Sequence, residues 1–361
     1  MKLGFGLYRH MLNKEHYNFA RQCGATHIVA HLVDYFYQGD HSHDHSQPVG
    51  DLDGWGVAGG TPDSAWSAEN LTNLKNEINK HGLELEAIEN FDPAHWHDIL
   101  LDGPRKIEQL ERLKQIIRNV GEAGIPAFGY NFSIAGVCGR IISNDARGNA
   151  ETVGMNGISE MNGAPIRNGM VWNMVYNENP SGGFLPEITH DELWDRLSVF
   201  LKELVPVAEE AGVRLAAHPD DPPLAYVRKQ PRLVYQPSMY QRLLDIVPSF
   251  HNGLELCLGT LAEMQEGDIY EICDHYTKQG KVVYIHLRNV SGKVPHYKET
   301  FIDEGDINIR RIMTILRDND FQGVLIPDHT PQMSCPAPWH AGMAFAMGYI
   351  KSLHQEITGV R

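Results

Sequence analysis

VVYIHLRN, residues 282–289, is an apolar run of strand length that ends abruptly in polar residues. Seven other runs along the chain have the same form, and amphipathic stretches separate them. Short apolar runs bounded in this way predict β-strands. The seven are LGFGLY from Leu3, THIVAH from Thr26, LELEAIE from Leu83, PAFGYNF from Pro126, VRLAAH from Val213, LELCLG from Leu254 and GVLIPDH from Gly323.

The segments between these runs are typical of helices. Residues 104–124 have Pro104 at a plausible first helical position and Gly124 at the end, and residues 190–212 repeat the pattern with Asp191 as the expected cap. Helix–Gly–strand junctions recur, which indicates repeated βα units and a parallel sheet. Eight such units favour an α/β fold of the closed (β/α)₈ or TIM barrel type. No GxGxxG follows the first strand, so dinucleotide binding has no support.

Two stretches are too long to be simple connections, namely residues 34–66 and 133–188. Parallel barrels often exceed 250 residues, so we expect one barrel domain over residues 1–361 that carries these two insertions. Both follow a strand and should emerge at the C-terminal face as lids or pocket walls, although insertions without a role at the site are the alternative. The first contains the run His41-Ser-His43-Asp-His45, which is more typical of a solvated loop than of a metal site.

The composition excludes several classes of protein. The formal net charge is -15, with 46 acidic against 31 basic residues, and such a surface repels nucleic acid and anionic membranes. No apolar run is long enough to span a bilayer, and the N-terminus has no apolar signal core. The five cysteines form no CxxC pair, which indicates reduced thiols and a cytoplasmic protein.

Four consecutive predicted strands each end in a residue that binds metals: His218, Cys257, His286 and Asp328. Adjacent strand ends converge on one rim of a barrel, so these side chains can meet at a point. One thiolate, two imidazoles and one carboxylate suit Fe²⁺, Mn²⁺, Co²⁺ or Zn²⁺. A single buried cysteine is usually inert and a single histidine is often structural. Four at equivalent positions favour a divalent metal site.

The residues beside these four are also polar. Arg288 is a candidate clamp for a substrate carboxylate, because guanidinium binds carboxylate through two parallel hydrogen bonds, and a salt bridge at the barrel rim is its alternative. His329 could act as a general acid or base, or could orient a metal ligand. Asn131 could bind substrate or close a turn.

The segments AAHPDDPP, LCLGT, HLRNV and PDH, together with GLELEAIEN, RNVGEAGIPAFGYNF and DEGDINI, resemble the mannonate dehydratase family. The resemblance covers most of the barrel. It implies a lyase of carbohydrate and hexuronate degradation that removes water from D-mannonate and forms 2-keto-3-deoxy-D-gluconate, with Mn²⁺ or Fe²⁺. Oligomers are common in this family, so the resemblance is compatible with a homo-oligomer. By resemblance the metal ligands are His218, Cys257, His286 and Asp328, the catalytic histidine is His329, and Arg288 and Asn289 fall in the HLRN motif.

The chain departs from the family at positions that face substrate. The first strand usually carries Arg-Trp-Tyr, whereas this chain ends its strand with Tyr8. Gly-Arg usually follows the final Asp-His, and here Thr330-Pro331 stands there. The catalytic tyrosine expected in the next loop is absent from CPAPWHAGMAF, and His340 is a candidate replacement. These losses suggest a divergent branch that keeps the metal. We therefore assign Tyr8, Asn131, Arg288 and Asn289 to substrate binding, and His329, Arg288 and His340 to catalysis.

Other reactions fit the same metal site. A sugar isomerase or epimerase on a barrel like that of xylose isomerase would use the ion to polarise a ketose or aldose oxygen. A lyase acting on a modified sugar would use the space that the remodelled loops offer. A sugar-binding barrel without catalysis is the remaining alternative.

Overall fold

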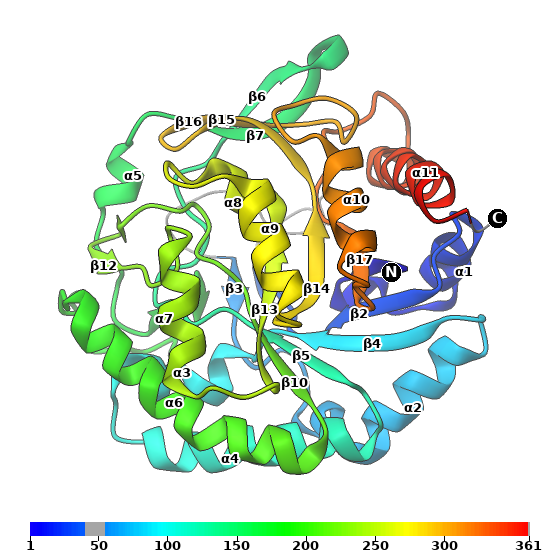
Figure 1. The fold of residues 1–361 in the computed structure, drawn as a ribbon. Coiled ribbons are helices and arrows are strands. Elements are labelled where there is room, and N and C mark those ends of the chain that lie inside the picture. The colour runs from blue at the N-terminus through cyan, green and yellow to red at the C-terminus, as the bar shows by residue number, and fades with distance from the viewer. Residues whose placement is uncertain (40–54, 360–361) are drawn as a thin grey trace.

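The structure, a computed structural model, describes residues 1–39 and 55–359, so the run from His41 to His45 lies outside the described residues. Eight parallel strands close into a barrel in the order β1-β17-β14-β13-β10-β5-β4-β2 (Figure 1). All eight coincide with the predicted runs, which confirms the barrel. They are β1 (Lys2–Leu7), β2 (His27–His31), β4 (Glu84–Glu89), β5 (Ala127–Tyr130), β10 (Arg214–Ala217), β13 (Asn252–Cys257), β14 (Val282–Leu287) and β17 (Val324–Pro327).

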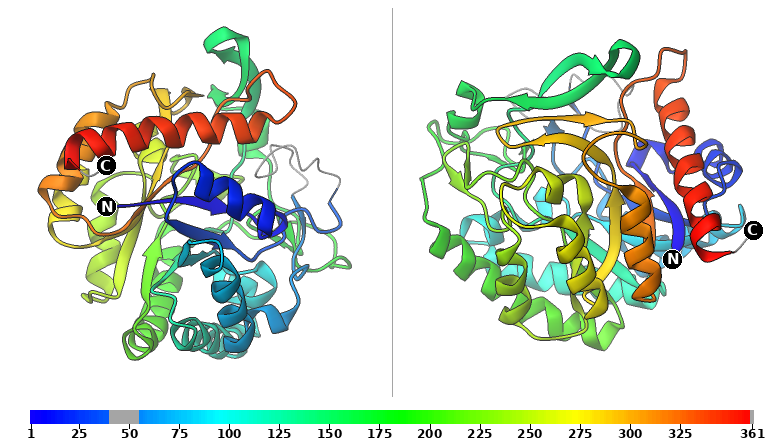
Figure 2. Two further views of the ribbon diagram at one scale, coloured as in Figure 1. Left: turned by 90° about the vertical axis from the view of Figure 1, so that its right-hand side faces the viewer. Right: turned by 45° about the horizontal axis from the view of Figure 1, so that its top comes forward.

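Helices surround the barrel (Figures 1 and 2). Their amphipathic sequences bury one face against the strands, and a large apolar cluster of strand and helix side chains fills the space between the two layers. They are α1 (Lys14–Gln22), α2 (Ala68–Asn79), α3 (Pro93–Leu101), α4 (Lys106–Glu122), α6 (His190–Ala211), α7 (Ser238–Ile246), α8 (Leu258–Glu263), α9 (Ile269–Lys278), α10 (Ile309–Asp318) and α11 (Pro338–Thr358), with short 3-10 turns η1 (Arg9–Met11), η2 (Asp63–Trp66) and η3 (Arg147–Asn149).

Both predicted helices are present, but their caps differ from the expectation. The first begins at Lys106, two residues after Pro104. The second begins at His190, and its cap is Thr189 and not Asp191. The Thr189 hydroxyl accepts a hydrogen bond from the Glu192 backbone N–H, and the Glu192 carboxylate accepts one from the Thr189 N–H. This reciprocal pair satisfies two N–H groups at once, which explains why the helix starts earlier than Asp191 predicts.

The two insertions contain more regular structure than their sequences predict. A hairpin of β6 (Ile141–Ala146) and β7 (Ala150–Asn156) projects from the barrel (Figure 2) and joins the hairpin that follows β14 in a four-stranded sheet, β15-β16-β7-β6. From the other insertion, β3 pairs with β9, so the insertions also contact each other. The remaining short elements are β3 (Gly56–Val57), α5 (Glu160–Gly163), β8 (Met170–Val171), β9 (Met174–Val175), β11 (Tyr226–Val227), β12 (Gln230–Pro231), β15 (Asn289–Lys293) and β16 (His296–Thr300).

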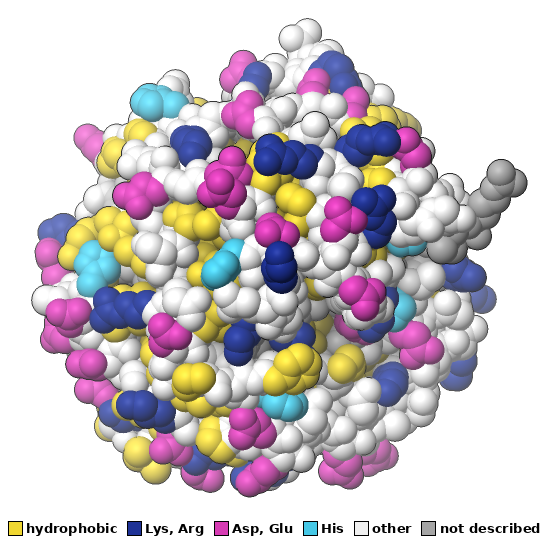
Figure 3. All heavy atoms as spheres, in the orientation of Figure 1, with side chains coloured by type: hydrophobic (Ala, Val, Ile, Leu, Met, Phe, Trp, Pro, Cys, Tyr) yellow, Lys and Arg dark blue, Asp and Glu magenta, His cyan; other side chains and the backbone are white. Residues whose placement is uncertain are grey.

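The surface carries charges of both signs. On the face shown in Figure 3, acidic and basic side chains are interspersed with apolar ones over the helices. Among the described residues, none of the helices combines the length and the apolar character that crossing a membrane requires. All five cysteines are free thiols.

Candidate metal centre and active site

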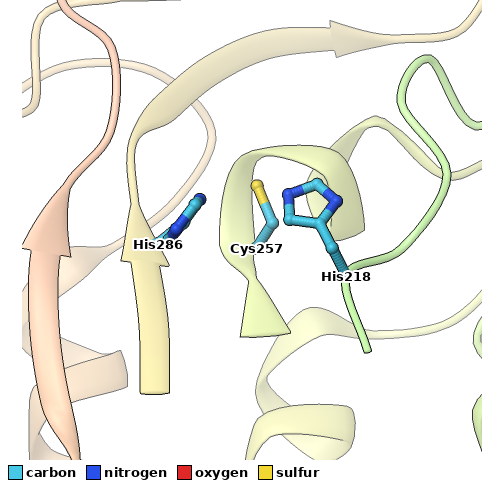
Figure 4. A group of neighbouring side chains, drawn as sticks. All are labelled: His218, Cys257 and His286. Carbon is cyan, nitrogen blue, oxygen red and sulfur yellow. The ribbon is translucent and has the colours of Figure 1, made fainter. Parts of the chain in front are cut away.

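Three of the predicted metal ligands converge at the C-terminal rim of the barrel. Cys257 is the last residue of β13, His286 is the next-to-last of β14, and His218 directly follows β10. Their ligand atoms all lie within 4.8 Å of one another. Figure 4 shows the sulfur between the two imidazole rings, with all three side chains pointing into the same space. The structure therefore brings these three residues together as the sequence predicts.

Asp328, the fourth predicted ligand, lies beside this group. Its Oδ1 is 3.6 Å from His286 Nδ1, and its Oδ2 is 4.0 Å from Cys257 Sγ. Although burial opposes ionisation, the neighbouring His329 and His286 hold the pKa of Asp328 below its ordinary value. The carboxylate is therefore charged and faces two of the other ligands.

The two imidazoles are held so that one nitrogen of each faces the cluster. His286 Nε2 lies 3.2 Å from a Glu89 oxygen and 2.9 Å from a Glu255 oxygen, which leaves Nδ1 on the side of Asp328. The Nδ1 of His218 is 2.5 Å from the Pro219 carbonyl oxygen, which leaves Nε2 as its ligand atom. A carboxylate or carbonyl behind a histidine is the usual support of a metal ligand.

The donor set fits a divalent ion. Two ligand atoms that each lie about 2.1 Å from one tetrahedral ion are about 3.4 Å apart. The distance between His286 Nδ1 and Asp328 Oδ1, 3.6 Å, is close to this value. His286 Nδ1 is buried and makes no hydrogen bond within the described part of the chain. Burial opposes ionisation of Cys257, but Arg288 and the two imidazoles hold the pKa of its thiol well below the ordinary value. A thiolate, a carboxylate and an unbonded imidazole nitrogen are ready to bind a cation.

The sequence analysis missed three buried polar residues below this cluster. Glu89 and Glu255 form a second group of potential ligands with His286, and His31 Nε2 lies 3.7 Å from Glu89. His31 and Glu89 close β2 and β4, just as the predicted ligands close their strands, so the strand-end argument applied to all eight strands would have found them. Glu255 lies two residues before Cys257, and alternation places both on one face of β13.

Arg288 does not act as the predicted carboxylate clamp in this structure. Its side chain is 1% exposed and pairs with protein carboxylates: Asp221 at 2.6 Å, Glu263 at 2.7 Å, Glu299 at 3.2 Å and Asp328 at 3.1 Å. It is not among the residues that line the pocket. Four protein carboxylates already surround the guanidinium of Arg288. The structure therefore favours the alternative interpretation of Arg288, in which it forms salt bridges within the protein.

Two further predicted residues also lie away from the pocket. The Asn289 amide donates to the carbonyls of Ile302 and Ile307 and accepts from the Ile307 N–H, so it shapes a buried loop in place of contacting substrate. His340, on α11, packs beside His16 with ring centroids 5.3 Å apart and lines a different surface cavity. The structure does not bring His340 to the strand-end cluster, because α11 carries it over the outside of the barrel.

A pocket opens above the cluster, and the space free of protein atoms in it, including solvent at its mouth, is about 540 Å³. Six of the predicted site residues line it: Tyr8, Asn131, His218, His286, Asp328 and His329. Both insertions contribute to its wall, as predicted. Of the described residues, those that line it include neither lysine nor arginine. The full lining is Tyr8, His31, Tyr35, Trp55, Glu89, Asn90, Asn131, Val137, Trp172, His218, Asp221, His286, Asp328 and His329.

His329 is placed to handle protons at this pocket. Its Nδ1 lies 2.9 Å from Glu299 and its Nε2 lies 3.3 Å from Asp328. Burial lowers the pKa of His329, but Asp328 and Glu299 more than offset this and raise it above the ordinary value. These carboxylates therefore favour the protonated ring, which is suited to donate a proton.

Comparison with known proteins shows what the chain is similar to. It matches the family model described as D-mannonate dehydratase (UxuA) over residues 15–140 and 184–360. The mannonate dehydratase of Streptococcus pneumoniae strain 70585 is 33% identical over 275 residues, which cover 73% of this chain and 74% of that protein. That of Geobacillus thermodenitrificans strain NG80-2 is 33% identical over 290 residues, which cover 73% and 75%.

Solved structures agree with this. The crystal structure of mannonate dehydratase from Streptococcus suis serotype 2 has a TM-score of 0.73 and 25% identity, and the match covers 99% of this chain and 94% of that one. A structure of L-ribulose 3-epimerase has a TM-score of 0.57 at 14% identity, and shares the fold.

Proposed function

Because the chain belongs to the D-mannonate dehydratase family, we propose that it is a hydro-lyase that converts D-mannonate to 2-keto-3-deoxy-D-gluconate and water. The observation that carries the proposal is the convergence of His218, Cys257 and His286, with Asp328 beside them, at the floor of a pocket that His329 also lines.

We propose that His218, Cys257, His286 and Asp328 hold Mn²⁺ or Fe²⁺. The sulfur donor favours Fe²⁺, Zn²⁺ or Co²⁺, and the carboxylate keeps Mn²⁺ acceptable. When bound, such an ion would acidify the proton at C2 of the acid and ease departure of the hydroxyl at C3. The five free cysteines fit an enzyme of the reducing cytoplasm, where a thiolate ligand stays reduced.

The charged imidazole of His329 is the group we assign to the leaving hydroxyl. Loss of water breaks the C2–H and C3–O bonds and forms an enol, which becomes the keto acid by tautomerisation. The departing oxygen needs a proton, and His329 carries one at the pocket wall. Glu299, which accepts from its other nitrogen, keeps the ring turned to the pocket.

His31 is the group we assign to the C2 proton. It lines the pocket at the end of β2, two strands from β17 in the barrel. Tyr8 stacks on its ring at 4.4 Å, and Glu89 lies on its Nε2 side. Burial lowers the pKa of His31, so the ring is neutral and can accept a proton. By this assignment His31 takes the role that the resemblance gives to a tyrosine in the loop after the final Asp-His, which this chain lacks there.

The test is an assay of the purified protein, loaded in turn with Mn²⁺ and Fe²⁺, on D-mannonate. We expect a 2-keto-3-deoxy acid whose mass is lower than that of the substrate by one water. A product of unchanged mass would indicate an isomerase or epimerase and would contradict the proposal. Unchanged D-mannonate with every divalent ion tried would also contradict it.

A further inference from the structure

One wall of the pocket is aromatic and comes from the insertions. Tyr35, Trp55 and Trp172 all line it, and their ring centroids lie 5.3 to 5.6 Å apart. Trp55 meets the other two rings at steep angles of 80° and 89°. Tyr35 and Trp55 are each only 2% exposed, whereas Trp172 is partly exposed. Trp172 is therefore the ring that a ligand would meet, and the other two support it.

The backbone under Trp172 is unusual for so large a residue. Trp172 and Asn173 form the two-residue turn between β8 and β9, with φ values of 52° and 59°. Such turns usually contain asparagine and glycine, because left-handed backbone is unfavourable for bulky side chains. Hydrogen bonds fix the turn: the Trp172 N–H donates to Ile134 at 2.7 Å, and the Trp55 N–H donates to Asn173 at 2.6 Å. Strain retained at a pocket indicates a functional constraint on the ring.

Trp172 lies outside the segments that match the family, whereas Tyr35 and Trp55 lie inside them. The family match leaves out residues 141–183, which include Trp172. His218, His286 and Asp328 lie at the metal end of the pocket. The Tyr35 hydroxyl lies 3.4 Å from His31 Nδ1 and accepts a hydrogen bond from the Asn90 amide at 3.1 Å, so the apolar part of the wall is the two indole rings. Substrate specificity that differs from that of the family would therefore arise at the wall, while the metal end stays the same.

The distribution of charge orients the substrate. The carboxylate of an aldonate requires positive charge, and within the described residues the pocket lining offers no lysine or arginine for it. Within the described residues, the lining offers positive charge from the metal end and from the imidazoles beside it. The far end of the carbon chain then lies against the wall. The indole ring of Trp172 gives close contact to C–H groups and gives a terminal hydroxyl no hydrogen-bond acceptor.

We propose, on the basis of the dehydratase function above, that the aromatic wall binds the end of the aldonate remote from its carboxylate and selects an apolar end. A 6-deoxyhexonate, with a methyl group at C6, is the substrate class that fits. The preference between the two acids distinguishes this wall from a polar subsite. A site built to bind a hydroxyl discriminates against the analogue without it by about four orders of magnitude in kcat/KM, whereas an apolar site does not.

The test compares the binding of D-mannonate and 6-deoxy-D-mannonate by calorimetry to the metal-loaded protein. A His329→Asn background prevents turnover during the titration, and kcat/KM for both acids is measured in the unmodified enzyme. We expect 6-deoxy-D-mannonate to bind at least as tightly as D-mannonate. Trp172→Asn, which suits the left-handed backbone, should weaken binding of the 6-deoxy acid about tenfold or more and narrow its advantage. Trp172→Phe, which keeps a ring, should retain part of the advantage.

Phe184→Ala is the matched control, because Phe184 is an exposed aromatic residue of the same insertion that does not line the pocket. It should leave both affinities unchanged. D-mannonate binding ten times tighter than its 6-deoxy analogue, or an unchanged ratio in Trp172→Asn, would overturn the wall's role. If neither acid loses water, the proposed dehydratase function is wrong. The ratio of the affinities for the two acids, then measured on the unmodified protein, still tests the role of the wall.

Discussion

The floor and the wall of the pocket differ in origin. The floor consists of strand ends, where Cys257, His286 and their partners occupy equivalent positions on neighbouring strands of one closed barrel. The wall consists of insertions, where Trp55 and Trp172 are held by short strand pairs and a strained turn. The family match includes the floor and leaves out residues 141–183 of the wall. From this difference we expect the strand ends to determine the chemistry and the insertions to determine which substrate is accepted.

The largest effect should come from the proton donor at the floor. His329→Asn removes the charged imidazole and should reduce kcat by about 10²- to 10⁴-fold, because general acid catalysis contributes that much. Metal content should not change, since His329 is not one of the four ligands. Steady-state kinetics and metal analysis on the same sample give both values. Full activity in this variant would assign proton transfer to another residue.

The ion-pair network below the floor should have the next largest effect. Arg288→Met removes the buried cation that these four carboxylates share, and should lower the free energy of unfolding by about 3 to 5 kcal/mol. Urea unfolding measures the loss. Arg310→Met is the control, because Arg310 pairs with Glu356 on the exposed surface and such pairs contribute at most about 1 kcal/mol. Equal losses in the two variants would contradict the buried network.

Glu89 should tune the metal without binding it directly. Glu89→Gln weakens the acceptor behind His286 and should reduce metal affinity by about 10- to 100-fold, as expected for the residue that supports a ligand. A calorimetric metal titration measures this. Glu86→Gln is the matched control on the same strand, since Glu86 pairs with Lys2 away from the pocket. Unchanged affinity in Glu89→Gln would separate Glu89 from the metal site.

The smallest effect concerns the attachment of an insertion. Asp92 accepts hydrogen bonds from the backbone of Ala94 and of Gly59, and burial raises the pKa of its carboxyl to about 6. Because the folded pKa exceeds the unfolded one, this group adds stability that is complete below about pH 4 and is lost as pH rises through 6. Asp92→Asn should remove this slope, which amounts to about 2 kcal/mol between the two pH values below. Unfolding at pH 4.5 and 7.5 measures it, and an unchanged slope would contradict the assignment.

The barrel and its four strand-end residues could be predicted because each strand is a short apolar run that stops at a polar residue. Trp172 could not be placed, because two-residue strands such as β8 and β9 have no periodicity. The sequence does not reveal that Glu263 and Glu299 pair with Arg288, because they come close to it only in the folded chain. Without these partners, Arg288 was interpreted as a clamp for a substrate carboxylate. His340 follows the last strand in sequence, and only the path of α11 shows that it lies elsewhere.

The central claim is that the ends of four neighbouring strands hold one cation, and X-ray absorption at the metal edge tests it most directly. We predict one sulfur ligand at about 2.3 Å, with nitrogen and oxygen ligands completing the shell. The sulfur should disappear in Cys257→Ser, together with most of the metal affinity. A spectrum without sulfur in the native protein, or with sulfur retained in Cys257→Ser, would contradict the account.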